Sequence, residues 1–145
     1  MDELETLIFR TDRIGDFIIS CPLIKSYKNQ FPKNPITLIS SEYNFIHIDK
    51  FEFISKTIPL KGKIKLLPKL IILVKMIIFL RKKTYKDIIV LDGKARSFFI
   101  SFFLNGKKSI LLQSKKLIIL SKILNYQIVI NSEVQNLSLI HISEP

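Results

Sequence analysis

Four charged side chains and a glycine stand close together in the segment FRTDRIGDFIIS, residues 9–20. Arg10 and Arg13 are cations that can hold phosphate through paired N–H donors. Asp12 and Asp16 are carboxylates that can accept a proton. Because apolar runs lie on both sides, we expect these charges where a buried strand passes into a helix. Their chemistry fits a site for an anionic or hydroxyl-bearing ligand.

A purely structural explanation of the same segment stays open. Asp16 could simply cap a helix, because the backbone N–H groups of a first helical turn favour a carboxylate. Arg10, Asp12 and Arg13 could then form solvated ion pairs. Gly15 permits either a positive φ or a close approach by a ligand. Neither GxGxxG nor GxxxxGK[ST] occurs in the segment, which argues against a dinucleotide site or a P-loop there.

Short apolar runs alternate with longer helical patterns along the chain, which predicts βαβ units. The first, fourth and fifth predicted strands are continuously apolar, as parallel strands covered on both faces should be. We therefore expect an α/β fold, a Rossmann-like open parallel sheet with helices on both faces. The predicted strands are Thr6–Phe9, Ile36–Ser40, Lys56–Leu60, Asp87–Asp92, Ser109–Gln113 and Gln127–Asn131, and the predicted helices are Gly15–Gln30, Ile64–Thr84, Lys94–Leu104 and Ser114–Leu124.

Prolines leave the start of two helices open. Pro22 fits a kink in a helix that starts at Gly15. It equally fits the first turn of a helix capped by Ser20, where a missing N–H costs nothing. The second alternative makes the residues before Ser20 a tight connection. Pro68 presents the same choice, and there a helix that starts near Leu66 is the simpler alternative.

The predicted sheet places a second group of residues near the charged segment. Ligands of an open parallel sheet bind at the carboxyl ends of its strands. Asp92 and Gly93 end the fourth predicted strand, so we expect them at the same edge as the charged segment. They are either a cap and a turn or ligand contacts. Lys94 and Arg96 either add positive potential there or are solvated.

The chain has 145 residues, which suits one domain, and its 23 basic against 12 acidic residues give a net charge of +11. Such a charge favours an anionic partner, namely nucleic acid, a phosphorylated glycolipid or a membrane surface. Coding bias explains it equally well, because only four of the basic residues are Arg. We do not expect nucleic-acid binding, since the lysines do not interleave with aromatics on one element and no nucleic-acid motif appears.

One cysteine and two histidines argue against a disulfide framework, a multi-cysteine zinc site or any metal centre. We therefore expect no metal and no cofactor. The N-terminal MDELETLIF is acidic and lacks the basic-then-apolar pattern of a secretory signal. This predicts a cytoplasmic location.

The longest apolar run is Leu66–Leu80, which contains Lys69, Lys75 and a proline and is too short for a confident membrane span. It is flanked by KGKIK and RKK, so it could lie on anionic lipid with its apolar face down. The other alternative is that it packs on the sheet. The two are compatible, so peripheral contact with the inner membrane remains an expectation.

The segment LIFRTDRIGDFIISCPLIKSYKNQFPKNPITLISSEYN resembles the start of the family-nine glycosyltransferases, the lipopolysaccharide heptosyltransferases. The shared features are a strand, an arginine-containing turn that ends in Gly-Asp, an apolar helix with a proline, a basic stretch closing on Phe-Pro, and a second strand. YKDIIVLDGKARSFFISFFLNGKKSILL is similar to the family's later strand, acidic-glycine turn and Arg-Ser-bearing helix. The resemblance covers most of residues 7–112.

The resemblance implies a GT-B architecture, in which two Rossmann-like domains face each other. Residues 1–136 would then be the N-terminal, acceptor-side domain, and the donor-binding C-terminal domain would be absent. Residues 137–145, LSLIHISEP, resemble the translation of a sequencing-library adapter and are expected to be non-native. With half of the site missing, we expect the isolated fragment to be inactive.

The resemblance also implies an inverting transfer of a heptose, or a similar sugar, from a nucleotide-sugar donor to a hydroxyl of a lipopolysaccharide-core-type acceptor. It puts the general base on Asp16 and the arginines on the phosphates of a phosphorylated glycolipid. The alternative is a basic membrane-surface or anionic-ligand-binding α/β module without catalysis. The expected substrate-binding residues are Arg10, Thr11, Arg13, Gly15, Asp92 and Gly93.

Overall fold

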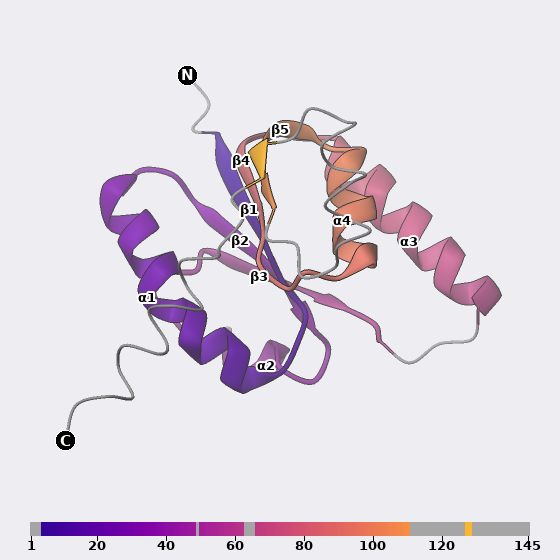
Figure 1. The fold of residues 1–145 in the computed structure, drawn as a ribbon, viewed down its shortest axis with the longest axis horizontal. Helices are drawn as coiled ribbons and strands as arrows, with labels where there is room; N and C mark the ends of the chain where they lie inside the picture. The colour runs from indigo at the N-terminus through magenta and orange to yellow at the C-terminus, as the bar shows by residue number, and fades with distance from the viewer. Residues whose placement is uncertain (1–3, 49, 63–65, 111–126, 129–145) are drawn as a thin grey trace.

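The computed structural model describes residues 4–48, 50–62, 66–110 and 127–128. They form a parallel sheet with helices on both faces (Figure 1). The strands are β1 (Glu5–Arg10), β2 (Ile36–Ser41), β3 (Lys56–Leu60), β4 (Thr84–Val90), β5 (Asn105–Ile110) and β6 (Gln127–Ile128), and the described helices are α1 (Ile14–Gln30), α2 (Phe45–Ile48), α3 (Leu66–Arg81) and α4 (Ala95–Phe102).

The strand order is β3-β2-β1-β4-β5-β6, and every neighbouring pair is parallel. This is the order of the doubly wound Rossmann fold, so the predicted fold class is confirmed. The winding reverses between β1 and β4. Ligands of such sheets bind outside the carboxyl ends of the strands at this switch point.

Two apolar cores cover the two faces of the sheet. On one face, Phe17 and Ile24 of α1 lie in a fully buried cluster with Ile8. On the other, α3 and α4 cover a cluster that contains Leu7 and Phe9. Figure 1 shows α1 and α2 on one side of the strands and α3 and α4 on the other. Because alternate β1 side chains enter opposite cores, the central residues Leu7, Ile8 and Phe9 are all apolar.

Helix α1 runs without interruption from Ile14 to Gln30 and contains Pro22. The alternative of a helix capped by Ser20 is therefore wrong. The Ser20 hydroxyl donates instead to the backbone oxygen of Asp16, one helical turn earlier, at 2.8 Å. Pro22 is exposed, so its ring lies on the solvent side of the helix.

Helix α3 begins at Leu66, the simpler of the two alternatives for Pro68, and it packs on the sheet as predicted. Leu80 is buried in the core, and Leu73, Met76 and Ile77 pack against it. The expectation that this helix extends to residue 84 is wrong, because β4 already begins there. Within the described ranges, no helix combines the length and hydropathy that crossing a bilayer requires.

The predicted bounds of β4 and β5 are wrong by several residues. β4 begins three residues before Asp87 and stops at Val90. β5 begins four residues before Ser109 and contains two lysines, so it is not continuously apolar. The reason is that β5 pairs with β4 from Asn105 onward, with a shift of register between Thr84 and Asp87, and Gly106 permits the close approach there. A Cβ on Gly106 would lie 2.7 Å from the backbone oxygen of Tyr85.

Three further differences concern short or late segments. The four-residue helix α2 was not predicted. The start of the sixth predicted strand is present as β6, which pairs with β5. The predicted helix Ser114–Leu124 and the tail 137–145 lie outside the described residues.

Candidate functional site

The two loops that follow β1 and β4 meet at the switch point of the sheet. β1 ends at Arg10 and β4 at Val90, and the Leu91 N–H continues the pairing by donating to the Phe9 oxygen at 3.0 Å. Residues 11–13 and 92–94 follow directly. The sequence-based expectation that the two loops share one edge is therefore confirmed.

Asp92 is the hydrogen-bonded centre of this edge, and only 4% of it is exposed. Its Oδ2 accepts from the Thr11 hydroxyl at 2.5 Å, from the Thr11 N–H at 3.3 Å and from the Ser97 hydroxyl at 2.6 Å. Its Oδ1 accepts from the Lys94 N–H at 3.1 Å. Gly93 adopts φ 60°, a left-handed turn that favours glycine. Asp92 thus joins the β1 loop to the start of α4.

Thr11 and Lys94 reinforce the same connection. Thr11 is 3% exposed, and its backbone oxygen accepts from the Lys94 ammonium at 2.8 Å. The alternative of a freely solvated Lys94 is therefore wrong. Arg96 also has a defined partner, since it donates to the Lys61 oxygen at 3.0 Å. The predicted substrate-binding roles of Thr11, Gly93 and Asp92 stay predictions, and their present contacts are within the protein.

The guanidinium of Arg10 is engaged by backbone oxygens on both loops. Nε and Nη2 donate to the Asp16 oxygen at 3.1 and 2.7 Å, and Nη1 donates to the Leu91 oxygen at 2.5 Å. Only 11% of the side chain is exposed. Arg10 therefore holds the first turn of α1 against the β4 loop, and a phosphate would have to compete with these bonds.

Asp12 lies beside Arg10, with its Oδ1 at 3.2 Å from Nε. This oxygen is buried and accepts no hydrogen bond, because the Nε–H is directed at the Asp16 oxygen. Burial raises the pKa of Asp12, the Arg10 charge opposes that rise, and the Asp16 and Asp92 carboxylates add to it. The three carboxylates are therefore within electrostatic reach of one another.

Asp16 differs from its neighbours because its main chain is held while its carboxylate is open. The residue lies in the first turn of α1, as predicted. Its backbone oxygen accepts from Arg10 and Ser20. Its side chain is half-buried, and no described residue donates a hydrogen bond to its carboxylate or forms an ion pair with it. The carboxylate is thus free to accept a proton or hydrogen bond from a ligand.

Gly15 and Arg13 form the exposed surface next to Asp16. Gly15 lies within α1 without a positive φ, so that alternative is wrong. A Cβ at Gly15 would meet nothing within 4 Å, so the space beside it is open. Arg13 is the N-cap residue of α1, is exposed, and makes no side-chain hydrogen bond to the helix. Close approach by a ligand at Gly15 remains a prediction.

Two residues of this edge were missed from the sequence. Ser97 is fully buried and bonds to Asp92, and its position in the first turn of α4 was the only available signal. Asn44 is 8% exposed and donates to the Asp12 backbone oxygen at 2.7 Å. No sequence spacing relates Asn44 to the charged segment, because Asn44 lies in the loop between β2 and α2. Among the described residues, no group of three or more His, Cys, Asp or Glu could hold a metal ion.

Known structures with this fold include three glycosyltransferases. E. coli heptosyltransferase WaaC with ADP matches with a TM-score of 0.63 and 17% identity over 74% of this chain and 36% of that chain. The glycosyl transferase family 9 protein from Veillonella parvula DSM 2008 matches with 0.65 and 15% over 75% and 32%. E. coli ADP-heptose lps heptosyltransferase II matches with 0.62 and 16% over 74% and 30%.

This chain therefore has the fold of one part of those proteins and spans about a third of their length. The resemblance to family-nine glycosyltransferases seen in the sequence has a structural counterpart. No protein-family model matches the chain, and no curated protein sequence matches it.

Proposed function

From the fold that this chain shares with part of the heptosyltransferases, we propose that it is the acceptor-side domain of an inverting glycosyltransferase. The full-length enzyme transfers a heptose, or a similar sugar, from a nucleotide-sugar donor to a hydroxyl of a lipopolysaccharide-core-type acceptor. The donor domain is supplied by the remainder of the protein. The 145-residue chain alone does not catalyse the transfer.

The observation that supports this proposal best is that the main chain of Asp16 is held in place while its carboxylate is open to a ligand. Its backbone oxygen is held by the Arg10 guanidinium at 2.7 and 3.1 Å, while no described residue engages its carboxylate. It lies at the carboxyl edge beside the switch point, where ligands of this fold bind. A general base requires this combination of fixed position and open acceptor atoms.

In the proposed reaction, the acceptor hydroxyl oxygen attacks the anomeric carbon of the donor sugar from the side opposite the leaving group. The new C–O bond forms as the bond to the nucleoside diphosphate breaks, and the diphosphate takes that electron pair. The Asp16 carboxylate takes the hydroxyl proton as the oxygen becomes more acidic. The transferred sugar therefore inverts its anomeric configuration.

The acceptor's phosphate is assigned to Arg13 in this proposal. Arg13 is exposed at the start of α1, and its guanidinium can bind phosphate through two parallel donors. Arg10 is the weaker candidate because its donors already bond to Asp16 and Leu91. Arg10 instead fixes the main chain of the proposed base.

The donor in the proposal is a nucleotide-heptose. Two of the solved structures support this choice, since WaaC was crystallised with ADP and with ADP-2-deoxy-2-fluoro heptose. These ligands were bound by WaaC, which is 16–17% identical to this chain.

The decisive experiment uses the full-length protein with ADP-heptose and a deacylated lipopolysaccharide-core acceptor. We expect Asp16→Ala to lower kcat by about 10²–10⁴-fold, the usual contribution of a general base. Glu42→Ala is the control, because Glu42 is an exposed carboxylate just after β2, at the carboxyl edge of the sheet. Its kcat should stay within about twofold of wild type, as expected for a surface residue outside the reaction.

Circular dichroism of both variants checks that the fold is kept, and NMR of the product reports the anomeric configuration. Near-wild-type turnover by Asp16→Ala would discard Asp16 as the base. A product with retained configuration would refute the inverting mechanism. Sugar transfer by the 145-residue chain would contradict the proposal that a second domain is needed.

A further inference from the structure

Helix α3 is apolar on the side that faces away from the sheet as well as on the side that packs against it. Its inner residues, including Leu80, belong to the buried core. Its outer residues are 45–60% exposed, with Ile71 at 55% and Ile78 at 58%. A helix that is apolar all round normally has a second apolar environment. We call this outer surface the outer α3 surface; it consists of Leu70, Ile71, Val74, Ile78 and Phe79.

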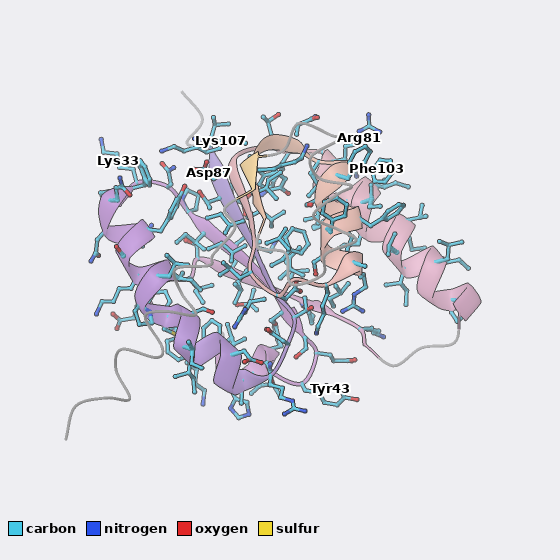
Figure 2. The ribbon with its side chains drawn as sticks, in the orientation of Figure 1. Lys33, Tyr43, Arg81, Asp87, Phe103 and Lys107 are labelled. Atoms are coloured by element: carbon cyan, nitrogen blue, oxygen red, sulfur yellow. The ribbon has the colours of Figure 1, made fainter. Side chains whose placement is uncertain are left out.

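The outer α3 surface continues onto α4, which contacts α3. Phe99, Phe102 and Phe103 of that helix and its C-cap are 47%, 38% and 38% exposed. Their rings pack edge to face, with centroids 5.0 and 5.2 Å apart. Figure 2 shows Phe103 and Arg81 on this layer, at the opposite end of the molecule from Tyr43. Large apolar patches of this kind mark interaction surfaces.

In the sequence, the charges of the segment that contains α3 have one sign, although Lys83 pairs with Glu5 and Lys86 lies over the Phe31 ring at the end of α1. Residues 53–86, which lead into α3, form it and leave it, contain ten basic residues and no acidic residue. Lys75 and Lys82 are exposed, and the Lys56 ammonium lies 5.8 Å from the centroid of the Phe79 ring. By contrast, residues 1–52 contain eight acidic and six basic residues. The outer α3 surface therefore has exposed lysines on it or next to it.

We propose that the outer α3 surface and the exposed α4 phenylalanines bind the surface of a bilayer that contains anionic lipid. The aliphatic and aromatic side chains enter the boundary between headgroups and acyl chains, and the lysines contact the anionic headgroups. The positive charge of this surface favours anionic lipid over a second copy of this chain as the binding partner. A symmetric dimer through this surface would place two cationic patches against each other, which is unfavourable.

This binding mode leaves the candidate site accessible. Asp16 lies on α1, which covers the opposite face of the sheet from α3 (Figure 1). A bilayer against α3 therefore does not cover the Asp16 edge. The inference stands on the surface chemistry alone and does not require the transfer reaction.

The test is flotation of the 145-residue chain with vesicles of phosphatidylcholine, with and without phosphatidylglycerol, at low and high salt. We expect binding to the mixed vesicles at low salt, with a loss of at least about tenfold in partitioning at high salt, because the lysine contribution is screened. Pure phosphatidylcholine should bind the chain more weakly. Absence of binding to the mixed vesicles at low salt would overturn the proposal.

Paired isoleucine variants locate the contact. Ile71→Glu with Ile78→Glu should reduce partitioning by more than about tenfold, because two apolar side chains no longer enter the interface. The matched control is Ile18→Glu with Ile19→Glu on α1, where the side chains are 57% and 78% exposed. The control should stay within about twofold of wild type, as expected on the far side of the sheet. An equal loss in both pairs would refute the assignment to α3.

A charge pair tests the same surface without changing its apolar residues. Lys75→Glu with Lys82→Glu should lower binding by more than about tenfold, since each cation near an anionic membrane contributes about fivefold. Lys33→Glu, an exposed lysine beyond α1, is the control (Figure 2). Circular dichroism verifies that each variant is folded. If sedimentation shows a dimer that Ile71→Glu with Ile78→Glu dissociates, while vesicles bind nothing, the surface belongs to a second copy and the lipid proposal is wrong.

Discussion

Two aspartates at neighbouring strand ends have opposite surroundings in this molecule. Asp92, after β4, is buried and accepts four hydrogen bonds from Thr11, Ser97 and Lys94. Asp16, after β1, is half-buried, and no described residue engages its carboxylate. Both stand next to a glycine at the same edge of one sheet. A residue type and its place in the fold therefore do not reveal whether a carboxylate supports structure or is open to a ligand.

The order of the two dipeptides explains the difference. In Asp92-Gly93 the aspartate precedes the helix, and the left-handed glycine brings the N–H of Lys94 back to its carboxylate. In Gly15-Asp16 the aspartate is already helical, and the open space at Gly15 lies beside it. The first arrangement uses the carboxylate oxygens within the protein, and the second leaves them available.

The largest stability difference should separate the two aspartates themselves. We expect Asp92→Asn to lower the free energy of unfolding of the 145-residue chain by about 3 kcal/mol or more, because the hydroxyls of Thr11 and Ser97 lose a charged acceptor in a buried place. Asp16→Asn should change it by less than about 0.5 kcal/mol. Urea unfolding measures both. If Asp16→Asn is the more destabilising of the two, the comparison is wrong.

Arg10 and Arg13 should also differ in how much each contributes to the free energy of unfolding. Arg10→Met should lower the free energy of unfolding by about 2–3 kcal/mol, because the backbone oxygens of Asp16 and Leu91 lose buried charged donors. Arg13→Met, at an exposed position, should cost less than about 0.5 kcal/mol. Equal costs in the same urea titration would show that Arg10 does not hold the two loops together.

Replacing Gly93 and Gly15 by alanine should change the stability of the fold in opposite directions. Gly93→Ala should destabilise the folded state by about 1–2 kcal/mol, because the Cβ of an alanine is sterically unfavourable at the left-handed φ of 60°. Gly15→Ala should stabilise by about 0.5–1 kcal/mol, because it lies inside a helix with nothing within 4 Å of the new Cβ. Thermal unfolding of both variants checks these signs. A destabilised Gly15→Ala would mean that the space beside Asp16 is not open.

The smallest effect concerns Asp12, which lies in the loop after β1 beside Arg10. Burial raises its pKa, with Arg10 opposing, so the folded state holds the proton more tightly than the unfolded chain does. The contribution of Asp12 to the free energy of unfolding is therefore most favourable below the ordinary pKa of 3.8 and is lost as the pH rises through the raised pKa. We expect Asp12→Asn to be more stable than wild type at neutral pH, with the difference vanishing in acid.

Urea unfolding of wild type and Asp12→Asn at several pH values measures this difference. Lys33→Ala, on an exposed loop away from this edge, serves as the control and should show the wild-type pH dependence. A variant that is less stable than wild type at neutral pH would show that the Arg10 ion pair outweighs burial at Asp12.

Local chemistry in the sequence was enough to predict β1, β2 and β3 and the helix between β1 and β2, but not α2 or the residue at which α1 begins. The apolar run of β1 and the Gly-Asp pair indicate a strand followed by a helix without help from distant residues. The common edge of Asp16 and Asp92 was also predictable. Parallel strands always present their carboxyl ends together, so two residues that follow two such strands meet.

Partners from distant parts of the chain could not be predicted. The start of β5 depends on its register with β4 and on the close approach at Gly106, so apolar runs placed it four residues too late. Asn44 donates to Asp12 from the β2–α2 loop, and no sequence spacing indicates this contact. Ser20 shows the same limit, since its residue type fits both a cap and a helix interior, and the unbroken α1 decided between them.

By itself, the sequence determined which residues are charged, which runs are apolar, and that strands alternate with helices, because these follow from side-chain type and short spacing. Only the tertiary structure decided that Arg10 and Asp92 are hydrogen-bonded within the protein, while no described residue engages the Asp16 carboxylate, Arg13 is exposed, and the outer residues of α3 are exposed. The physical reason is that hydrogen-bond saturation and burial depend on groups brought together from many residues away. Sequence spacing does not record these distances.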